Sequence, residues 1–295
     1  MTLACRFRIA YTALHGVGEQ ILRSALDRAG FHDVHSVGAQ SDPDGTFPTV
    51  AFPNPEEKGA LDRVIDLATE VNADLVLAND PDADRLAVAT KIDGRWQQLS
   101  GNESGCVCSR TTFLSTERKS NAVWYSTIVS SPMLASIAKA HGIRHEQTLT
   151  GHKWIQNRAI ELEREGYEFL FGYEEALGYA VSRLVRDKDG ISAAIVVADA
   201  VARFKHDGKT LFDELLTMSK RYGVFRSRQV SIQLTQPEDF ADRRDRLIRL
   251  TQETPSSFEI SSFDEIEGVL RFIVDRRHRV MVRPSGTEPK LRILF

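Results

Sequence analysis

Three aspartates alternate with two small residues directly after an apolar run. The run at 74–78, Asp-Leu-Val-Leu-Ala, predicts a short buried strand, and Asp80, Asp82 and Asp84 follow it. In an extended segment, residues two apart point to the same side, so the three carboxylates would converge. Such a cluster is unfavourable unless a cation lies among its members, and carboxylate oxygens favour Mg²⁺ over zinc or copper. We therefore predict a magnesium site, with an ordinary acidic turn as the alternative.

A second candidate site lies near the end of the sequence, in the segment Arg-Pro-Ser-Gly-Thr-Glu-Pro-Lys at 283–290. Arg283 offers a guanidinium group that can grip a phosphate through two hydrogen bonds. Ser285 and Thr287 add hydroxyl groups, and Gly286 lets backbone N–H groups approach an anion closely. These four residues are candidate phosphate ligands, although their spacing alone fits an ordinary polar turn equally well.

Two further segments place polar groups at predicted turns. Lys153 lies where Thr-Gly-His-Lys-Trp, residues 150–154, meets a predicted helix start, and helix starts attract anions. A solvated lysine beside a helix cap is the alternative interpretation. Glu174 and Glu175 lie in an acidic loop predicted at 172–178, where they could accept hydrogen bonds from vicinal sugar hydroxyls or belong to a solvated turn. We take these three as candidate substrate-binding residues.

The composition excludes several classes of protein. The 38 basic and 41 acidic residues give a net charge of −3, so the chain lacks the basic excess that is typical of nucleic-acid-binding proteins. The longest apolar run, at 193–198, is far shorter than the ~20 residues of a membrane span, and the N-terminus shows no signal-peptide pattern. Cys5, Cys106 and Cys108 lack metal-site spacing and fit reduced thiols. We expect a cytoplasmic protein without a nucleic-acid or membrane partner.

The elements that must position these residues follow a repeated order of strand, turn, helix, glycine, spacer, helix, strand, acidic loop and strand. In the first unit we predict strands at 5–11, 74–78 and 86–89 and helices at 19–29 and 61–71. In the second we predict strands at 122–128 and 168–171 and helices at 130–140 and 154–163. An apolar helix at 190–205 follows. Further on we predict a strand at 230–234, a charged helix at 240–251 and a hairpin at 269–282.

Alternating strands and helices favour α/β layers. The predicted fold class is α/β: two repeated three-layer α/β/α domains with mixed, mostly parallel sheets, followed by a smaller α+β domain. Ligands of such sheets gather beyond the carboxyl ends of the strands, where both acidic loops are expected.

These segments, in this order, resemble the α-D-phosphohexomutase superfamily, the phosphomannomutases and phosphoglucomutases. The resemblance covers nearly the whole chain, and two of its motifs, GYEEALGY and FPNPEE, look most like the subgroup that includes phosphoglucomutases and phosphopentomutases, alongside actinobacterial-type phosphomannomutases. It is carried by YTALHGVG at 11–18, FPNPEE at 52–57, NDPDADR at 79–85, TGHKW at 150–154, GYEEALGY at 172–179, DKDG at 187–190 and RPSGTEPK at 283–290.

The resemblance implies the second to fourth domains of a four-domain enzyme. Residues 1–103 would be the metal-binding domain, 104–221 the sugar-recognition domain, and 222–295 the phosphate-binding domain, incomplete at its C-terminus. It implies that Asp80, Asp82 and Asp84 bind Mg²⁺ and that Arg85, the one catalytic residue we carry over, balances the transferring phosphoryl group. It also implies a sugar-hydroxyl role for Glu174. The phosphate ligands would be Arg283, Ser285, Gly286 and Thr287.

The family's first domain carries a phosphorylated serine in a Ser-His-Asn-Pro-like loop, and these 295 residues contain no such segment. The expected reaction moves a phosphoryl group between the 1- and 6-positions of mannose or glucose phosphate, through the phosphoserine and a bisphosphate intermediate. We expect this chain to be inactive alone. A non-catalytic module that binds Mg²⁺ or sugar phosphate, one half of a split enzyme with a separately encoded N-terminal domain, a phosphopentomutase and a metal-dependent phosphatase are the alternatives.

Overall fold

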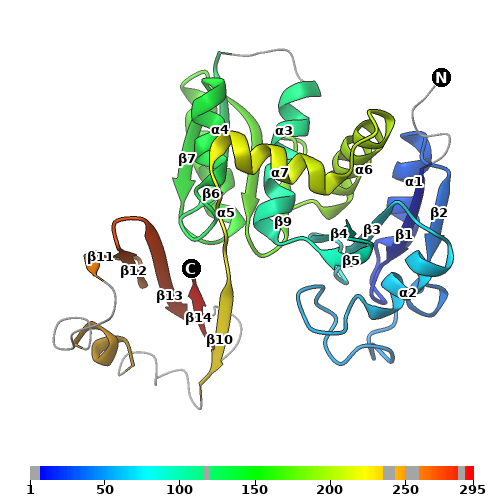
Figure 1. Ribbon diagram of the computed structural model, residues 1–295, viewed down its shortest axis with the longest axis horizontal. Helices are drawn as coiled ribbons and strands as arrows, with labels where there is room; N and C mark the ends of the chain where they lie inside the picture. Colours follow the sequence, from blue (N-terminus) through cyan, green and yellow to red (C-terminus); the bar gives the residue numbers. More distant parts are fainter. Residues whose placement is uncertain (1–6, 116–119, 235–242, 250–258, 285–289) are drawn as a thin grey trace. The chain divides into compact units, whose positions relative to one another are not determined.

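The structure, a computed structural model, describes residues 7–115, 120–234, 243–249, 259–284 and 290–295. It divides into two compact units, Met1–Phe225 and Arg226–Phe295 (Figure 1). The first unit holds two mixed α/β sheets, and the second holds one antiparallel sheet. The α/β fold class with a further small sheet domain is therefore confirmed.

The first sheet has the strand order β2-β1-β3-β4-β5. Its central strand β3 (Leu75–Asn79) is buried along its whole length, as its apolar sequence predicts. β3 and β2 (Asp33–Ser36) pair parallel to β1 (Arg8–Thr12). β4 (Leu86–Ile92) returns antiparallel to β3, and β5 (Arg95–Gln98) forms the edge. Helix α1 (Glu19–Arg28) lies between β1 and β2 in the sequence, and helix α2 (Asp62–Glu70) lies between β2 and β3. A short 3-10 turn, η1 (Gly38–Gln40), precedes α2.

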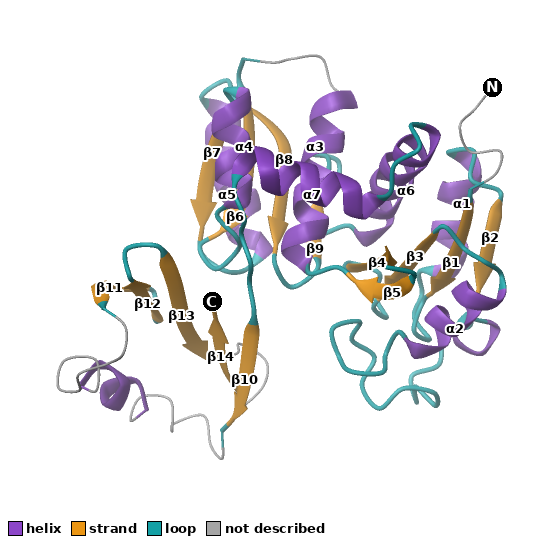
Figure 2. Cartoon of the chain, in the orientation of Figure 1, coloured by secondary structure: helices purple, strands orange, loops and turns teal. Residues whose placement is uncertain are grey.

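The second sheet has the strand order β7-β6-β8-β9. As in the first sheet, one strand, β6, pairs in parallel with a neighbour on each side, and a further strand, β9, is added antiparallel to β8. Its strands are β6 (Ala122–Thr127), β7 (Arg144–Thr148), β8 (Glu168–Glu174) and β9 (Gly178–Ala180). Helices α4 (Met133–His141) and α5 (His152–Arg164) connect them, and Figure 2 shows these helices beside the strands. The acidic loop predicted at 172–178 is shorter than expected, because residues 172–174 extend β8 and pair with β9.

A long apolar helix joins the two sheets of the first unit. α6 (Gly190–His206) packs against β3 and β4 of the first sheet and β9 of the second. It also contacts α1 and α3 (Gly101–Ser115). Its buried face consists of small alanine and valine side chains, which allow close approach on several sides. One continuous hydrophobic core therefore includes residues of both sheets.

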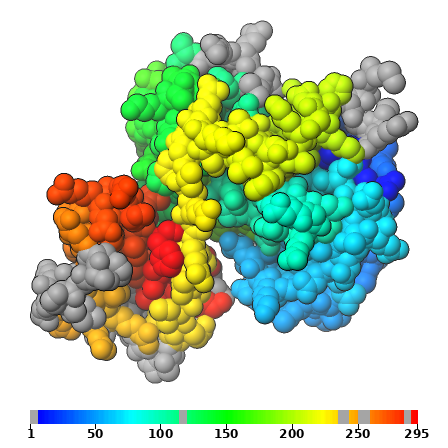
Figure 3. All heavy atoms as spheres, in the orientation of Figure 1, coloured from blue at the N-terminus to red at the C-terminus, as the bar shows by residue number. Residues whose placement is uncertain are grey.

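The last helix of the first unit covers part of its surface. α7 (Leu211–Tyr222) begins with a capping box, in which the Thr210 hydroxyl accepts from the Asp213 N–H and the Asp213 carboxylate accepts from the Thr210 N–H. Its buried face includes Leu211, Leu215 and Met218. In Figure 3 the α7 segment, yellow, lies on the outer surface of the face shown. No helix in the ranges that the structure describes has the length and apolar character needed to cross a bilayer.

The second unit is a five-stranded antiparallel sheet with the order β10-β14-β13-β12-β11. Its strands are β10 (Gln229–Gln233), β11 (Ile260–Ile266), β12 (Val269–Val274), β13 (His278–Pro284) and β14 (Lys290–Leu294). β12 and β13 form the predicted hairpin. A helical segment at 243–249 lies within the predicted charged helix. Leu270, Phe272, Val282 and Leu291 supply most of the buried core.

One half-buried histidine makes the stability of the first unit sensitive to acid. The Ser126 hydroxyl and His145 Nε2 lie 3.0 Å apart between the paired strands β6 and β7. Burial lowers the pKa of His145 to about 4, against the opposing charge of Glu146. The ordinary histidine pKa is about 6.5, so between these values the unfolded chain binds a proton that the folded chain does not. His145 therefore contributes stability near neutral pH that is lost as the pH falls from about 6.5 to about 4.

We predict that His145→Gln reduces this acid sensitivity. The free energy of unfolding of the wild type should fall by about 1–2 kcal/mol more than that of the variant between pH 7 and pH 4.5. Urea denaturation at the two pH values measures the difference. His206→Gln, at an exposed histidine of α6, is the control and should keep the wild-type pH dependence. Parallel curves for the wild type and His145→Gln would contradict the assignment.

Candidate functional site

The three aspartates converge at the carboxyl end of β3. One carboxylate oxygen each from Asp80, Asp82 and Asp84 lies within 4.8 Å of the others. Sequence reasoning found these residues but ascribed their convergence to an extended segment, which is wrong. The segment is a turn, in which the Ala83 N–H donates to the Asp80 carbonyl at 2.9 Å and Ala83 has a φ of +59°. A left-handed alanine costs about 1–2 kcal/mol, so the surrounding structure must stabilise this turn.

The environment of the carboxylates fits a cation. Burial, together with the charges of Asp84 and Asp82, raises the pKa of Asp80 to about 6. The Arg85 N–H opposes this by donating to Asp80 Oδ1 at 3.0 Å. Asp84 Oδ1 is buried and accepts no hydrogen bond from the residues that the structure describes. A hard divalent ion such as Mg²⁺ would satisfy this oxygen and offset the repulsion among the three carboxylates.

Two glycines allow other segments to hold this turn closely. A Cβ on Gly16 would lie 2.3 Å from Pro81 Cα, and the neighbouring Val17 N–H donates to the Pro81 carbonyl at 2.9 Å. A Cβ on Gly190 would lie 2.3 Å from the Arg85 carbonyl oxygen. The Gly190 N–H donates to the Ala83 carbonyl at 3.1 Å. The acidic turn is therefore fixed from both sides by backbone contacts that no larger residue would permit.

Two cations lie against the carboxylates. Arg85 Nε is 3.4 Å from Asp80 Oδ2 and 3.7 Å from Asp84 Oδ1, and its side chain is about one-third exposed. Lys188 Nζ is 2.9 Å from Asp84 Oδ2 and 3.2 Å from Asp187 Oδ1. Arg85 was expected at this site from the sequence, whereas no role was expected for Lys188, although it lies in the DKDG motif. The acidic residues on either side of Lys188 were the feature of the sequence that could have identified it as part of this site.

The candidate sugar-binding residue Glu174 ends β8 and is buried. Its Oε1 accepts from the Gly151 N–H at 2.8 Å, and its Oε2 lies 3.5 Å from His152 Nδ1. Burial would raise the pKa of Glu174, but His152, the Gly151 N–H and Lys188 outweigh it and lower that pKa. Glu174 is therefore held as a carboxylate, which accepts hydrogen bonds but donates none.

The other two candidate substrate residues lie in different surroundings. Glu175 is buried, and its Oε2 accepts from the Thr127 hydroxyl at 3.1 Å and the Ser130 hydroxyl at 3.2 Å. These bonds hold Glu175 against the last residue of β6 and the turn that follows it. Lys153 is exposed in the first turn of α5, where its ammonium group lies 5.3 Å from the centroid of the Trp154 ring.

The acidic turn and the Glu174 segment are joined through the backbone. The Leu86 N–H donates to the Leu177 carbonyl at 3.0 Å, and Arg85 and Gly178 form an isolated β-bridge. A Cβ on Gly178 would lie 2.5 Å from Lys188 Cδ and 3.7 Å from Glu174 Oε2. Lys188 thus pairs with Asp84 and lies near enough to Glu174 for its charge to lower the pKa of that carboxyl group.

The candidate phosphate ligands belong to the second unit. Arg283 lies near the end of β13, opposite Arg292 of β14 in the antiparallel register. Ser285, Gly286 and Thr287 lie outside the described residues.

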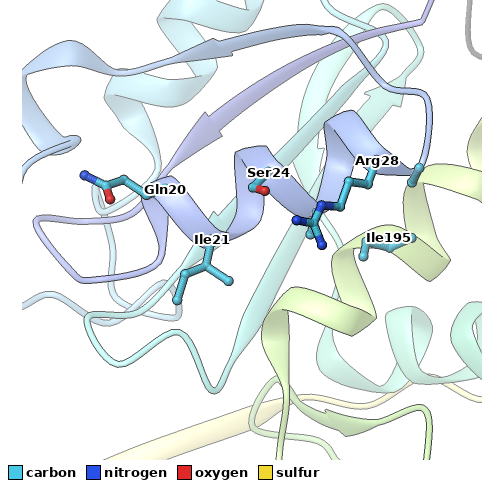
Figure 4. Close-up of a pocket in the computed structure, with 7 residues that line it drawn as sticks. Gln20, Ile21, Ser24, Arg28 and Ile195 are labelled. Carbon is cyan, nitrogen blue, oxygen red and sulfur yellow. The ribbon is translucent and has the colours of Figure 1, made fainter.

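The open pocket in Figure 4 is a different place on the first unit. Gln20, Ile21, Ser24 and Arg28 of α1 line it together with Ile195 of α6. No acidic side chain is among its described lining residues. The aspartates of the acidic turn are not among the residues that line this pocket.

Comparison with known proteins gives two family matches. Residues 3–93 match "Phosphoglucomutase/phosphomannomutase, alpha/beta/alpha domain II", and residues 100–220 match domain III of the same family. The chain is 43% identical over 300 residues to the "Probable phosphomannomutase" of Haemophilus influenzae, covering 98% of this chain and 59% of that protein. It is 40% identical over 273 residues to the phosphoribomutase of Saccharomyces cerevisiae, covering 87% of this chain and 44% of that protein.

A solved structure shares the fold. The phosphoglucomutase/phosphomannomutase family protein of Burkholderia thailandensis matches with a TM-score of 0.71 and 19% identity, over 98% of this chain and 56% of that chain. The chain thus spans about half of the length of the proteins it matches. The two consecutive family domains, the acidic turn after β3 and the shared fold together establish that the chain belongs to the α-D-phosphohexomutase superfamily.

Proposed function

We propose that this chain carries the metal-, sugar- and phosphate-binding parts of a phosphohexomutase, which moves a phosphoryl group between the 1- and 6-positions of mannose or glucose phosphate. The convergence of Asp80, Asp82 and Asp84 to within 4.8 Å is the observation on which the proposal chiefly depends. The two buried free thiols of Cys106 and Cys108 support a reducing compartment such as the cytoplasm as the site of action.

In this proposal, Asp80, Asp82 and Asp84 bind Mg²⁺. When bound, Mg²⁺ supplies positive charge that neutralises a phosphoryl group during transfer. Arg85, beside Asp80 and Asp84, places its guanidinium where it can pair with phosphoryl oxygens. Catalysis of this kind consists of positioning and charge neutralisation, and a turn fixed by backbone contacts serves both purposes.

In this proposal, residues of the first unit bind the sugar ring and residues of the second unit bind the non-reacting phosphate. Glu174, held ionised, accepts hydrogen bonds from sugar hydroxyls, with Lys153 and Glu175 as further substrate-binding residues. Arg283, with Ser285, Gly286 and Thr287, grips the phosphate. An arginine can hold a phosphate bidentately without reading the ring, so one phosphate site can serve substrates with different sugars.

A pentose phosphate is the second candidate substrate, because the yeast relative at 40% identity is named a phosphoribomutase. Calorimetric titrations of the chain with glucose 1-phosphate, mannose 1-phosphate and ribose 1-phosphate, each in the presence of Mg²⁺, distinguish the two. We expect the hexose phosphates to bind more tightly. Tighter binding of ribose 1-phosphate would replace the hexose proposal with the pentose one.

We predict that Asp82→Ala weakens Mg²⁺ binding by at least about tenfold, because one of three charged ligands is removed. Calorimetric titration of the full chain with Mg²⁺ or Mn²⁺ measures the change. Asp66→Ala removes an exposed carboxylate of α2 and is the matched control, which should bind like the wild type. Equal Mg²⁺ affinity of the wild type and Asp82→Ala would contradict the assignment of the metal site to these three aspartates.

We predict that Arg283→Ala weakens sugar-phosphate binding by about 1.5–3 kcal/mol, the range for a hydrogen bond to a charged group. The loss should be the same for glucose and mannose phosphates, because the guanidinium reads the phosphate. Arg277→Ala, at an exposed arginine of the hairpin between β12 and β13, is the control. A loss confined to one sugar would show that Arg283 contacts the ring.

A further inference from the structure

Lys188 pairs with the acidic turn from a distant part of the sequence. It lies in the segment between β9 and α6, more than a hundred residues after Asp84. Its Nζ is 2.9 Å from Asp84 Oδ2, and only 20% of its side chain is exposed. The ion pair of Lys205 with Asp74 in the same unit differs, because the Lys205 side chain is 49% exposed. Lys188 is therefore a largely desolvated cation placed against one of the three clustered carboxylates.

The backbone on both sides of Lys188 is fixed. The Asp189 N–H donates to the Tyr179 carbonyl at 2.8 Å, and the Gly190 N–H donates to the Ala83 carbonyl at 3.1 Å. The Asp189 carboxylate caps α6 by accepting from the N–H groups of Ile191 and Ser192. The stem of Lys188 passes over Gly178, where a Cβ would lie 2.5 Å from its Cδ. Only the end of the side chain is left to move, so the ammonium group is tethered within reach of Asp84.

The positive charge of Lys188 offsets part of the negative charge that the acidic turn carries. Asp80, Asp82 and Asp84 repel one another in a partly buried site, and without a compensating charge the turn would be unfavourable. Arg85 compensates in part, at 3.4 Å from Asp80 and 3.7 Å from Asp84. Lys188 makes the shorter contact, and it makes it with a carboxylate that a bound cation would also use.

We propose that Lys188 is a built-in counterion of the acidic turn, which pairs with Asp84 when no metal ion is bound and competes with the metal ion for that carboxylate. The inference rests on the proposed metal site and adds a positioning residue to it. When a metal ion takes Asp84, the Lys188 ammonium group keeps its second partner, Asp187 Oδ1, at 3.2 Å.

The test is Mg²⁺ titration of the full chain by calorimetry, combined with melting temperatures measured with and without Mg²⁺. In Lys188→Met, Mg²⁺ should bind about tenfold more tightly than in the wild type, because a competing charge at close range is removed. Without metal, the variant should melt about 2–4 °C lower, because Asp84 has lost its partner. Saturating Mg²⁺ should restore most of that difference.

Matched variants separate this effect from a general loss of charge or of packing. Lys205→Met removes a lysine from another ion pair of the same unit and should leave the Mg²⁺ affinity unchanged. Lys188→Arg keeps the charge and should stay near the wild type. Lys188→Gln, which keeps a hydrogen-bond donor for Asp84, should repeat the gain in affinity, and it provides the measurement if Lys188→Met does not fold.

Two outcomes overturn different parts of this proposal. If the wild type binds Mg²⁺ through Asp82 and the Lys188 variants bind it no more tightly, the counterion role is wrong and the metal site stands. An equal gain in Lys205→Met would likewise overturn the counterion role and leave the metal site in place. If neither the wild type nor the Lys188 variants bind Mg²⁺, the metal assignment fails, and the counterion role fails with it.

Discussion

Electrostatic repulsion among three carboxylates is the constraint on which the rest of the first unit depends. The three aspartates lie at the end of a fully buried strand, where Asp80 is buried and Asp84 half-buried, and desolvation there strengthens interactions between charges. Arg85 and Lys188 supply cations, and the N-terminus of α6 supplies a positive dipole end, since Gly190 donates to the turn itself. These contacts with Arg85, Lys188 and Gly190 hold the charged turn in place at the end of β3.

The parts of the structure that were predictable from the sequence are those with a strong local signal. Apolar β3 and the amphipathic helices α1 and α2 were found near their observed bounds because burial imposes a regular pattern on them. Edge strands β2 and β5 were missed. Their sequences, Asp-Val-His-Ser and Arg-Trp-Gln-Gln, are short and polar, because an edge strand buries little. Helix α3 was also missed, since it is buried on several sides and its sequence therefore shows no regular division into an apolar and a polar face.

The candidate site shows the same division between local and distant information. The spacing of the aspartates was enough to identify a cation site, although a left-handed Ala83, which brings them together, has no sequence signature. The contact between Lys188 and Asp84 depends on the backbone bonds of Asp189 to Tyr179 and of Gly190 to Ala83, which join segments far apart in the chain, and spacing in a single sequence does not encode them. Glu175 shows the converse case, since a residue next to Glu174 in sequence bonds instead to Thr127 and Ser130.

The small side chains of α6 have a consequence for how the first unit folds. The family divides this region into two α/β/α domains, yet α6 contributes its alanines and valines to one core that contains residues of both sheets. A fragment that stops after the first sheet would therefore expose the apolar surface against which α6 packs, and the second sheet without the first would expose the other face of the helix. The two domains are separate in the family's division of the chain but share one hydrophobic core in this molecule, so we expect the loss of either domain to destabilise the other.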